Sequence, residues 1–375
     1  MKICTLTCHN VYNPGASLQA YALCRYLSDC GHTVSVIDYR PDYLSGHFSL
    51  TAVPDQWRRR GLSLPYLLAK LPGRLMSRRR KKPFDRFTDS YLPLTPRSYN
   101  TVGELRADPP QADCYVAGSD QIWNTLFPTG RDAAFFLDFG PDSVRRVSYA
   151  ASFATPGLAP DCREAVRRHL QRFDVLSVRE GSGVTLVSDL GLEAVQVADP
   201  VLLLDKDRWL ALAEPSGLTL KAPGGYIALY DFDESPQTRA VVDKLRSQTG
   251  LPVFSIGGAR RRYADRSFTR LSPLQFVDAI AQAEYVVTGS FHATVFSMMF
   301  QKPFAFVERL DGLNERMTDL LRWTGLEQRV ATAGTPADRL TAPIDYDAVR
   351  SRIDEMTACS KDFLRTALGD GTNGR

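Results

Sequence analysis

Short apolar segments typical of strands alternate with helix-like segments along most of the chain, and this alternation constrains the fold more than any other feature. Residues 2–7 (KICTLT) and 33–39 (TVSVIDY) are the first two predicted strands, and a helical pattern from Leu18 to about Cys30 lies between them. Gly31 is expected to end that helix, as glycine commonly does. A strand, a helix and a second strand in this order predict a parallel α/β unit.

The alternation continues in two series, separated by an irregular stretch at residues 205–224 that ends in KAPGG and favours a domain junction. Because 375 residues exceed one ordinary core, we expect two doubly wound Rossmann-like α/β domains facing a cleft, over residues 1–204 and 225–345. A final helix within 346–375 is expected to pack back on the N-terminal domain. The further predicted strands are 112–120, 145–153, 174–180, 194–200, 226–232, 252–258, 285–290 and 303–307.

Positive charge is concentrated in one segment, an expected insertion at about residues 55–86. The net charge is +4, yet the stretch between Asp55 and Asp85 holds Lys and Arg but no acidic residue. Pro65 and Pro72 are expected to break it into short helices. Apolar residues flanked by cations favour contact of residues 58–82 with an anionic membrane surface, and a solvated insertion is the alternative. Nucleic-acid binding is not expected, because no binding motif accompanies these cations.

Several classes of protein are disfavoured by what the sequence lacks. No run of ~18 apolar residues predicts a membrane span, and the N-terminal MKICTLTCHNVYNPG has no apolar signal-peptide region, so a cytoplasmic protein is expected. The seven cysteines form no CxxC pair and no zinc-type spacing, which favours reduced, mostly buried thiols and no metal site. Neither GxGxxG nor a P-loop motif occurs.

The segment TGSFHATVFS, residues 288–297, places one of only five histidines between two apolar runs. Ligands of open parallel sheets bind where strands end and helices begin. Ser290 is expected to cap the helix that follows, which puts His292 in its first turn, at the rim of the cleft. The alternative is a histidine that only caps or packs.

Two further strand ends carry polar side chains. In GSDQIWN (118–124), Ser119 and Asp120 can hydrogen-bond a ligand hydroxyl, or form a plain Asx turn. In SVRE (177–180), Arg179 and the adjacent Glu180 emerge at a strand end. The guanidinium fork suits a carboxylate or a phosphate, and a structural ion pair at the domain interface is the alternative.

The segment NPGAS before the first helix holds further candidate contacts to an anion or an acceptor: Asn13, Gly15, with its capacity for close backbone approach, and Ser17 as a helix cap. VADP (197–200) is interpreted as a structural turn at the junction. Arginine, histidine, aspartate and serine at one cleft suit a small anionic donor and a hydroxylated acceptor.

Taken together, the motifs GSDQIWN, VSYAASF, SVRE, the ADPVLLL spacing to Trp209, VVTGSFHATVFSMMFQKPF and LNERMTDLL resemble the polysaccharide pyruvyl transferase family. PGASLQAYAL is also similar to the opening glycine turn and helix of that family. The resemblance runs from about residue 3 to about residue 330. The order and spacing of the motifs make it specific.

The resemblance implies a GT-B-like fold and transfer of pyruvate from phosphoenolpyruvate onto two hydroxyls of a sugar, giving a cyclic ketal. The acceptor would be a glycan of polysaccharide or exopolysaccharide biosynthesis or a lipid-linked saccharide, at the inner face of the plasma membrane. Neither metal nor cofactor would be needed. His292 would be the general acid, Arg179 would hold the donor, and Asp120 would orient or deprotonate the acceptor.

The family often has a basic residue about twenty positions after the histidine, which favours Arg316 for the donor phosphate, with Lys302 closer in sequence. Ser290 and Ser119 complete the expected donor contacts. This chain departs from the family pattern at Ala293, where relatives commonly have glycine. It also has Ser290-Phe291 where many relatives have Arg-Leu.

Two other functions stay open from the sequence. A GT-B glycosyltransferase with a nucleotide-sugar donor shares the fold, and Glu308 and Glu315 are its candidate ribose ligands. A non-catalytic glycan-binding protein is the second alternative. The acceptor sugar, the ketal positions and the oligomeric state are not encoded in a readable pattern.

Overall fold

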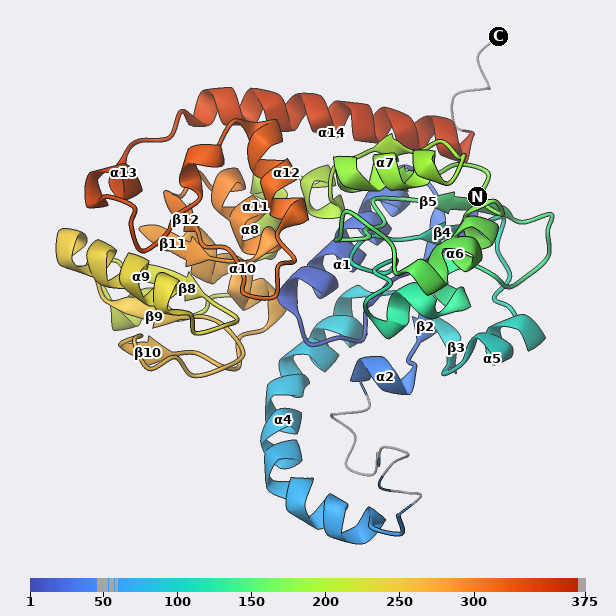
Figure 1. Ribbon diagram of the computed structural model, residues 1–375, viewed down its shortest axis with the longest axis horizontal. Coiled ribbons are helices and arrows are strands. Elements are labelled where there is room, and N and C mark those ends of the chain that lie inside the picture. Colours follow the sequence, from blue (N-terminus) through green and yellow to red (C-terminus); the bar gives the residue numbers. More distant parts are fainter. Residues whose placement is uncertain (46–52, 54–56, 58–59, 370–375) are drawn as a thin grey trace.

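The computed structural model describes residues 1–45, 53, 57 and 60–369. Arg58 and Arg59 of the basic segment, and residues 370–375 of the predicted C-terminal region, lie outside the described residues. Two parallel α/β units lie side by side and a long helix crosses both (Figure 1). The predicted α/β class with two Rossmann-like units is confirmed.

The N-terminal sheet has five parallel strands in the order β3-β2-β1-β4-β5. Its strands are β1 (Lys2–Leu6), β2 (Thr33–Tyr39), β3 (Leu94–Tyr99), β4 (Cys114–Ala117) and β5 (Arg145–Ser148). A small pair, β6 (Ser177–Val178) and β7 (Val195–Gln196), continues from β5 through isolated bridges. Sequence analysis missed β3, because LTPRSY alternates poorly and holds a proline, which an edge strand tolerates.

The C-terminal sheet repeats this arrangement, with five parallel strands in the order β10-β9-β8-β11-β12. Its strands are β8 (Ile227–Tyr230), β9 (Val253–Ser255), β10 (Arg266–Ser267), β11 (Tyr285–Thr288) and β12 (Phe304–Phe306). In both sheets the first strand lies at the centre, and the fourth pairs with it on the side opposite the second. Each sheet therefore has its topological switch point beside its first strand.

Helices connect the strands. They are α1 (Pro14–Asp29), α2 (Asp42–Ser45), α4 (Ser63–Tyr91), α5 (Val102–Ala107), α6 (Arg163–Leu170), α7 (Gly181–Asp189), α8 (Lys206–Leu212), α9 (Pro236–Thr249), α10 (Pro273–Ala281), α11 (Phe291–Met299), α12 (Glu315–Thr324), α13 (Ala337–Thr341) and α14 (Tyr346–Leu368). Helix α1 begins four residues before the expected Leu18. Asn13 is its N-cap and Pro14 its first residue, a position that suits the fixed φ of proline.

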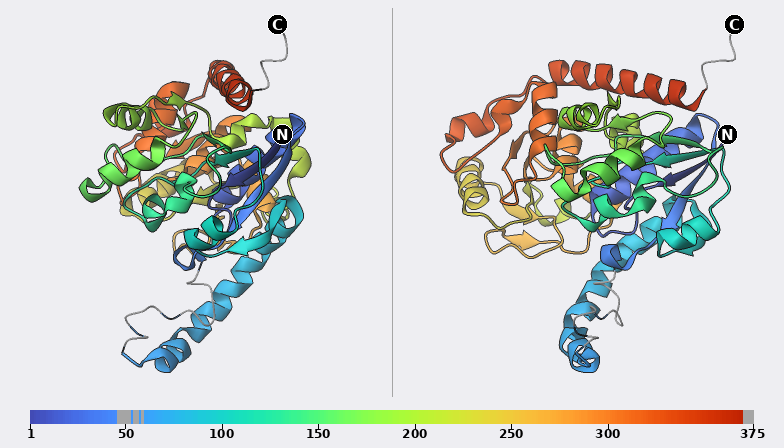
Figure 2. Two further views of the ribbon diagram at one scale, coloured as in Figure 1. Left: turned by 90° about the vertical axis from the view of Figure 1, so that its right-hand side faces the viewer. Right: turned by 45° about the vertical axis from the view of Figure 1, so that its right-hand side comes forward.

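Helix α4 corrects the expectation of short helices broken by proline. It runs unbroken over 29 residues and extends away from both units, curving along its length (Figure 1, Figure 2). Pro65 falls in the first turn, where no backbone N–H is needed for a helical hydrogen bond. Pro72 lies in the interior, where a proline bends a helix without having to end it.

The two units share one hydrophobic core. It includes Ile3 and Leu23 from the first unit and Phe296 from the second. Trp209 of α8, in the predicted junction, lies edge-on to Tyr21 at 5.9 Å and to Phe296 at 5.3 Å between ring centroids. The junction is therefore a packed segment, and the aromatic contacts hold α1 and α11 at fixed positions.

Helix α14 contacts both units. It packs on α11 and α12 of the C-terminal unit and on the short helix Pro200–Leu203 of the N-terminal unit. The hydroxyl of Ser360 accepts a hydrogen bond from the backbone of Ala198 at 2.8 Å. Figure 1 shows it crossing above both sheets.

Candidate active site

Polar residues gather where the carboxyl ends of the central strands of both sheets face each other. The first turn of α1, after β1, contributes Gly15, the loop after β4 contributes Ser119 and Asp120, and the first turn of α11, after β11, contributes His292. Both topological switch points are thus used together. The structure brings these predicted residues into one cluster, largely buried between the two units.

The centre of the cluster is Asp199, whose side chain is fully buried. Its Oδ2 lies 2.6 Å from Nη1 of Arg179, 3.2 Å from the Ser119 hydroxyl and 3.5 Å from Nε2 of His292. Its Oδ1 accepts the backbone N–H of Val201. One carboxylate therefore caps a short helix and joins three residues from both units.

Opposing effects act on the pKa of Asp199. Burial alone would raise it, but the charge and hydrogen bond of His292, together with Arg179, hold the pKa below its ordinary value. Asp199 is therefore ionised at neutral pH.

His292 packs directly against the backbone of Gly15. A Cβ atom on Gly15 would lie 2.0 Å from Nδ1 of His292, far inside contact distance. Only glycine can therefore occupy this position without moving the histidine ring or α1. The sequence predicted close approach at Gly15, and the approaching group is this imidazole.

Two arginines share the ring of Phe291. The guanidinium carbon of Arg179 lies 4.5 Å from the ring centroid and that of Arg316 lies 6.0 Å from it. Both side chains are buried. Nε and Nη2 of Arg179 and Nε of Arg316 have no hydrogen-bond partner within the part of the chain that the structure describes. Buried donors of this kind point to an anionic ligand.

The charge on Arg316 is poorly compensated. Burial and the nearby charge of Arg179 lower its pKa to about 10, while Asp120 opposes the shift. Its Nη1 lies 3.8 Å from Oδ1 of Asp120. Asp120 itself has a φ of 81°, a left-handed conformation that costs energy for a residue with a side chain. Such strain is common at functional sites.

The structure separates capping roles that the sequence left mixed. Ser290 is the N-cap of α11, as predicted, and accepts the N–H of Ala293. Asn13 caps α1 by accepting the N–H of Gly15. The prediction that Ser17 caps this helix is wrong, because α1 begins earlier and Ser17 is buried within it.

One oxygen of Glu180 is bonded within the protein while Oε2 has no hydrogen-bond partner among the described residues, and Lys302 does not take the position expected of a ligand contact. Oε1 of Glu180 is fully buried and accepts hydrogen bonds from Ser152 and from two backbone N–H groups, so it holds the chain after β5. Lys302 lies at the amino end of β12, whereas His292 lies beyond the carboxyl end of the parallel strand β11. The two residues are therefore at opposite ends of the strands, because α11 runs back along the sheet between them. The donor contact predicted for Lys302 is therefore not supported, and burial lowers the pKa of its ammonium.

Sequence reasoning missed Asp199 and Arg309. Asp199 ends the segment VQVAD, so the strand-end rule that selected Arg179 could have found it. Arg309 lies 4.6 Å over the ring of Phe232 and adds positive charge near Arg316. It approaches Gly289, where a Cβ would lie 3.2 Å from Cγ of Arg309. No sequence pattern marked it.

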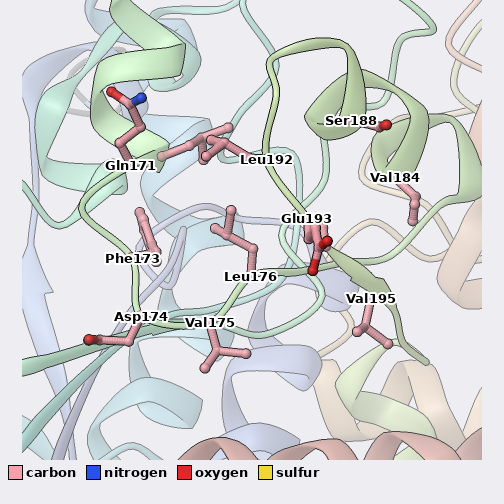
Figure 3. Close-up of a pocket in the computed structure, with 12 residues that line it drawn as sticks. Gln171, Phe173, Asp174, Val175, Leu176, Val184, Ser188, Leu192, Glu193 and Val195 are labelled. Carbon is pink, nitrogen blue, oxygen red and sulfur yellow. The ribbon is translucent and has the colours of Figure 1, made fainter.

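A separate pocket of about 640 Å³ lies between α6, α7 and the β6–β7 pair of the N-terminal unit (Figure 3). Leu176 and Leu192 line it together with the carboxylates of Asp174 and Glu193. None of the predicted site residues reaches it.

In the described residues, no group of three or more His, Cys, Asp or Glu side chains could hold a metal ion. Within the same residues, every helix is too short or too polar to cross a membrane.

The two α/β units, with the cluster between them, form a two-domain fold of the GT-B type. Solved structures of similar fold extend over nearly the whole chain. A UDP-N-acetylglucosamine 2-epimerase from Rickettsia bellii is 11% identical, with a TM-score of 0.53, over 98% of this chain and 96% of that one. S. aureus MnaA with UDP is 11% identical over 96% and 90%, with a TM-score of 0.51.

The chain belongs to the polysaccharide pyruvyl transferase family, whose model matches residues 13–311. The match includes Asn13, Asp120, Arg179, Asp199 and His292. The protein is therefore a transferase of polysaccharide biosynthesis, and the family implies a glycan acceptor. No curated protein is similar enough to count as a relative.

Proposed function

We propose that this protein transfers pyruvate from phosphoenolpyruvate to two hydroxyls of a sugar in a polysaccharide or lipid-linked glycan, forming a cyclic ketal without a metal or cofactor. One observation carries the proposal: two buried guanidinium groups with unpartnered N–H donors lie beside His292. A small substrate with two or three negative charges would accept hydrogen bonds from those N–H groups and neutralise the positive charge of the two arginines.

Phosphoenolpyruvate offers a carboxylate and a phosphate, and each accepts two parallel hydrogen bonds from a guanidinium fork. Nη1 of Arg179 is already bonded to Asp199, which orients the fork and leaves Nε and Nη2 for the donor. Arg316 would hold the second anionic group. Asp120, one-fifth exposed, marks the side of the cluster open to an acceptor.

The chemistry requires one proton to reach the methylene carbon of phosphoenolpyruvate. His292 would donate it, and C2 would then accept the first sugar hydroxyl while Asp120 receives that hydroxyl's proton. The C2–O bond to phosphate breaks, and the second hydroxyl closes the ketal. In balance, one hydroxyl proton ends on the new methyl group and the other on the released phosphate.

A thermal-shift titration with phosphoenolpyruvate tests donor binding. A donor at 100 times its Kd should stabilise the wild type by about 2.7 kcal/mol. The paired variant Arg179→Met with Asp199→Asn removes the ion pair without leaving an unpaired buried charge, and it should lose that stabilisation. His292→Gln should retain donor binding but lose phosphate release in the presence of a glycan acceptor.

UDP-N-acetylglucosamine belongs in the same titration, because the similar solved structures include proteins bound to UDP or acting on that sugar nucleotide. Stabilisation by the sugar nucleotide alone, with no response to phosphoenolpyruvate, would replace this proposal by a nucleotide-sugar glycosyltransferase. Equal stabilisation of wild type and paired variant by phosphoenolpyruvate would remove Arg179 from the donor site.

We also propose that the protein works in the cytoplasm, at the inner face of the plasma membrane, with α4 as the membrane contact. Helix α4 extends from the body of the molecule (Figure 1, Figure 2). Four of its leucines are exposed: Leu64, Leu68, Leu71 and Leu75. Their spacing of four, three and four residues keeps them on one helix face. Exposed cations of the same helix lie at Lys70, Arg78, Arg79, Lys82 and Arg86.

Co-sedimentation with vesicles tests this contact. Vesicles containing phosphatidylglycerol should bind the wild type more tightly than pure phosphatidylcholine vesicles, and less so at high salt. Leu64→Glu with Leu68→Glu should reduce binding by roughly tenfold or more. The control is Leu126→Glu, an equally exposed leucine far from α4 in sequence. A concentration-dependent dimer that the double variant abolishes would instead assign these leucines to a second copy.

A further inference from the structure

A groove leads away from the catalytic cluster between α4 and the carboxyl ends of β8 and β9. Its inner part is a pocket of about 150 Å³ lined by Tyr12 and Pro14, by Phe84 of α4 and by Tyr230 and Gly257 of the C-terminal unit. Pro14 adjoins Gly15, the residue in contact with His292. The groove therefore begins next to the catalytic histidine.

The outer part of the groove is a pocket of about 1180 Å³. The two pockets adjoin, because they share four lining residues: Arg80, Gly258, Phe268 and Thr269. A ligand pocket for one small molecule has a volume of about 300–1,000 Å³, so the outer pocket has room for several sugar or phosphate units.

The outer pocket is strongly cationic. Its six basic residues exceed the two carboxylates that line it, Glu234 and Asp265. Both carboxylates are engaged: Glu234 accepts the backbone N–H of Arg262, and Asp265 is paired with Arg246 outside the pocket. The basic residues of the pocket are Arg80, Lys221, Arg260, Arg261, Arg262 and Arg266.

Most of this positive charge has no counterion among the residues that the structure describes. Arg261 is bonded to Asp231 and to two backbone carbonyls. The side chains of the other four arginines form no salt bridge within the described residues: Arg80, Arg260, Arg262 and Arg266. Uncompensated like charges on the walls of one concave surface concentrate anions there.

The position of Arg80 ties this surface to α4. A Cβ on Gly258 would lie 3.0 Å from Nη2 of Arg80, so the glycine at the end of β9 leaves room for the guanidinium. Phe268 supplies an apolar surface beside these cations, with Lys221 5.9 Å from its ring centroid. Charged walls beside an aromatic ring suit an anionic saccharide better than a simple ion.

We propose that this groove is an acceptor subsite for a polyanionic segment, with the sugar diol at His292 and the anionic groups in the outer pocket. This inference rests on the proposed pyruvyl transfer. The anionic groups can be the diphosphate of a lipid-linked saccharide or the carboxylates of an acidic glycan. Both place several negative charges a few sugar-lengths or less from the reacting hydroxyls.

The test uses the full chain with Arg260, Arg262 and Arg266 each changed to glutamine. These side chains form no described ion pair, so the fold should be retained. The control changes three exposed arginines outside the groove to glutamine and has the same net charge: Arg168, Arg322 and Arg339. The probes are inorganic diphosphate, a carboxylate-rich oligogalacturonate and neutral maltohexaose, measured by calorimetry at low salt.

The groove variant should bind diphosphate or oligogalacturonate about tenfold more weakly than wild type, and the control should stay within twofold. Preference for diphosphate or for oligogalacturonate identifies the source of the anionic groups. Equal losses in both variants, or tighter binding of maltohexaose than of either anion, would overturn the subsite.

The phosphoenolpyruvate titration separates the two proposals. If phosphoenolpyruvate stabilises both variants but the groove variant loses no anion affinity, the subsite fails and pyruvyl transfer stands. If phosphoenolpyruvate has no effect, while UDP binds the wild type and not the groove variant, pyruvyl transfer fails and the groove is a nucleotide site.

Discussion

Replacing Arg316 with methionine should make the ligand-free protein more stable and at the same time remove its stabilisation by phosphoenolpyruvate. Burial and the charge of Arg179 lower the pKa of Arg316 to about 10, below the ordinary value of a guanidinium. This difference corresponds to a cost of about 3 kcal/mol for holding the charged side chain in the folded protein rather than in water. The ligand-free protein therefore bears a cost for holding this charge.

The attraction of Asp120, at 3.8 Å, is already included in the lowered pKa. Loss of the contact between Arg316 and Phe291, worth about 1 kcal/mol or less, and of the packing of the arginine stem reduces the expected gain. Methionine keeps most of the apolar stem. We therefore expect the free energy of unfolding to rise by about 1–2 kcal/mol, and the melting temperature by roughly 2–4 °C per kcal/mol.

Urea unfolding followed by tryptophan fluorescence measures this change, because Trp123 and Trp209 are fully buried. The control is Arg322→Met, an exposed position on the same helix, which should change stability by about 0.5 kcal/mol or less. Since the folded-state pKa of Arg316 is below its unfolded value, the penalty is fully present below about pH 10 and fades above it. The stability difference between Arg316→Met and wild type should thus be constant from pH 6 to 9.

A loss of stability beyond about 1 kcal/mol in Arg316→Met would refute the reasoning, because Arg316 would then be a net stabilising residue. Undiminished stabilisation by phosphoenolpyruvate would refute the other half, the assignment of Arg316 to the donor. If Arg316→Met raises the free energy of unfolding without ligand and abolishes the stabilisation by phosphoenolpyruvate, the charge of Arg316 serves binding at a cost in stability.

Three other predictions follow from the same geometry. Gly15→Ala should cost about 1–3 kcal/mol of stability and lower kcat at least tenfold, because its Cβ displaces the ring of His292; an unchanged kcat would contradict this. Asp199→Asn should lower the free energy of unfolding by about 3–5 kcal/mol in urea at pH 7. Because the pKa of Asp199 is lower in the folded state, that difference should shrink as the pH falls below about 4, and a growing difference would argue against it. Lys302→Ala should leave the Kd for phosphoenolpyruvate within twofold in calorimetry, since Lys302 lies at the opposite end of the strands.

The sequence was most informative where local chemistry and position in the sheet coincide. Ser290 was identified as a cap because serine between a strand and a helix has few other roles, and the structure confirms it. The strand-end rule selected Arg179, Asp120 and His292 from separate motifs, and the fold brings all three together. Such residues can be predicted because a parallel sheet places every carboxyl end at one edge.

Other features depend on contacts between distant segments. Lys302 follows His292 closely in sequence, but the helix between them carries it to the other end of the strands. Asp199 was interpreted as a turn residue, and it is one, but its other oxygen joins Arg179 and His292 from different units. The continuity of α4 through Pro72 was unpredictable from local propensity alone.

Helix α14 has a consequence for how the donor is captured. Helix α14 packs on α11, which carries His292, and on the short helix that Asp199 caps. It therefore connects the two halves of the cluster directly. A hinge motion about residues 205–224 alone would strain this second connection. The apparent Kd for the donor equals the intrinsic Kd divided by the fraction of molecules in the competent conformation. A helix that joins the two halves keeps that fraction high and the apparent Kd low. The conformational entropy lost in assembling the site is therefore lost on folding, before the donor binds.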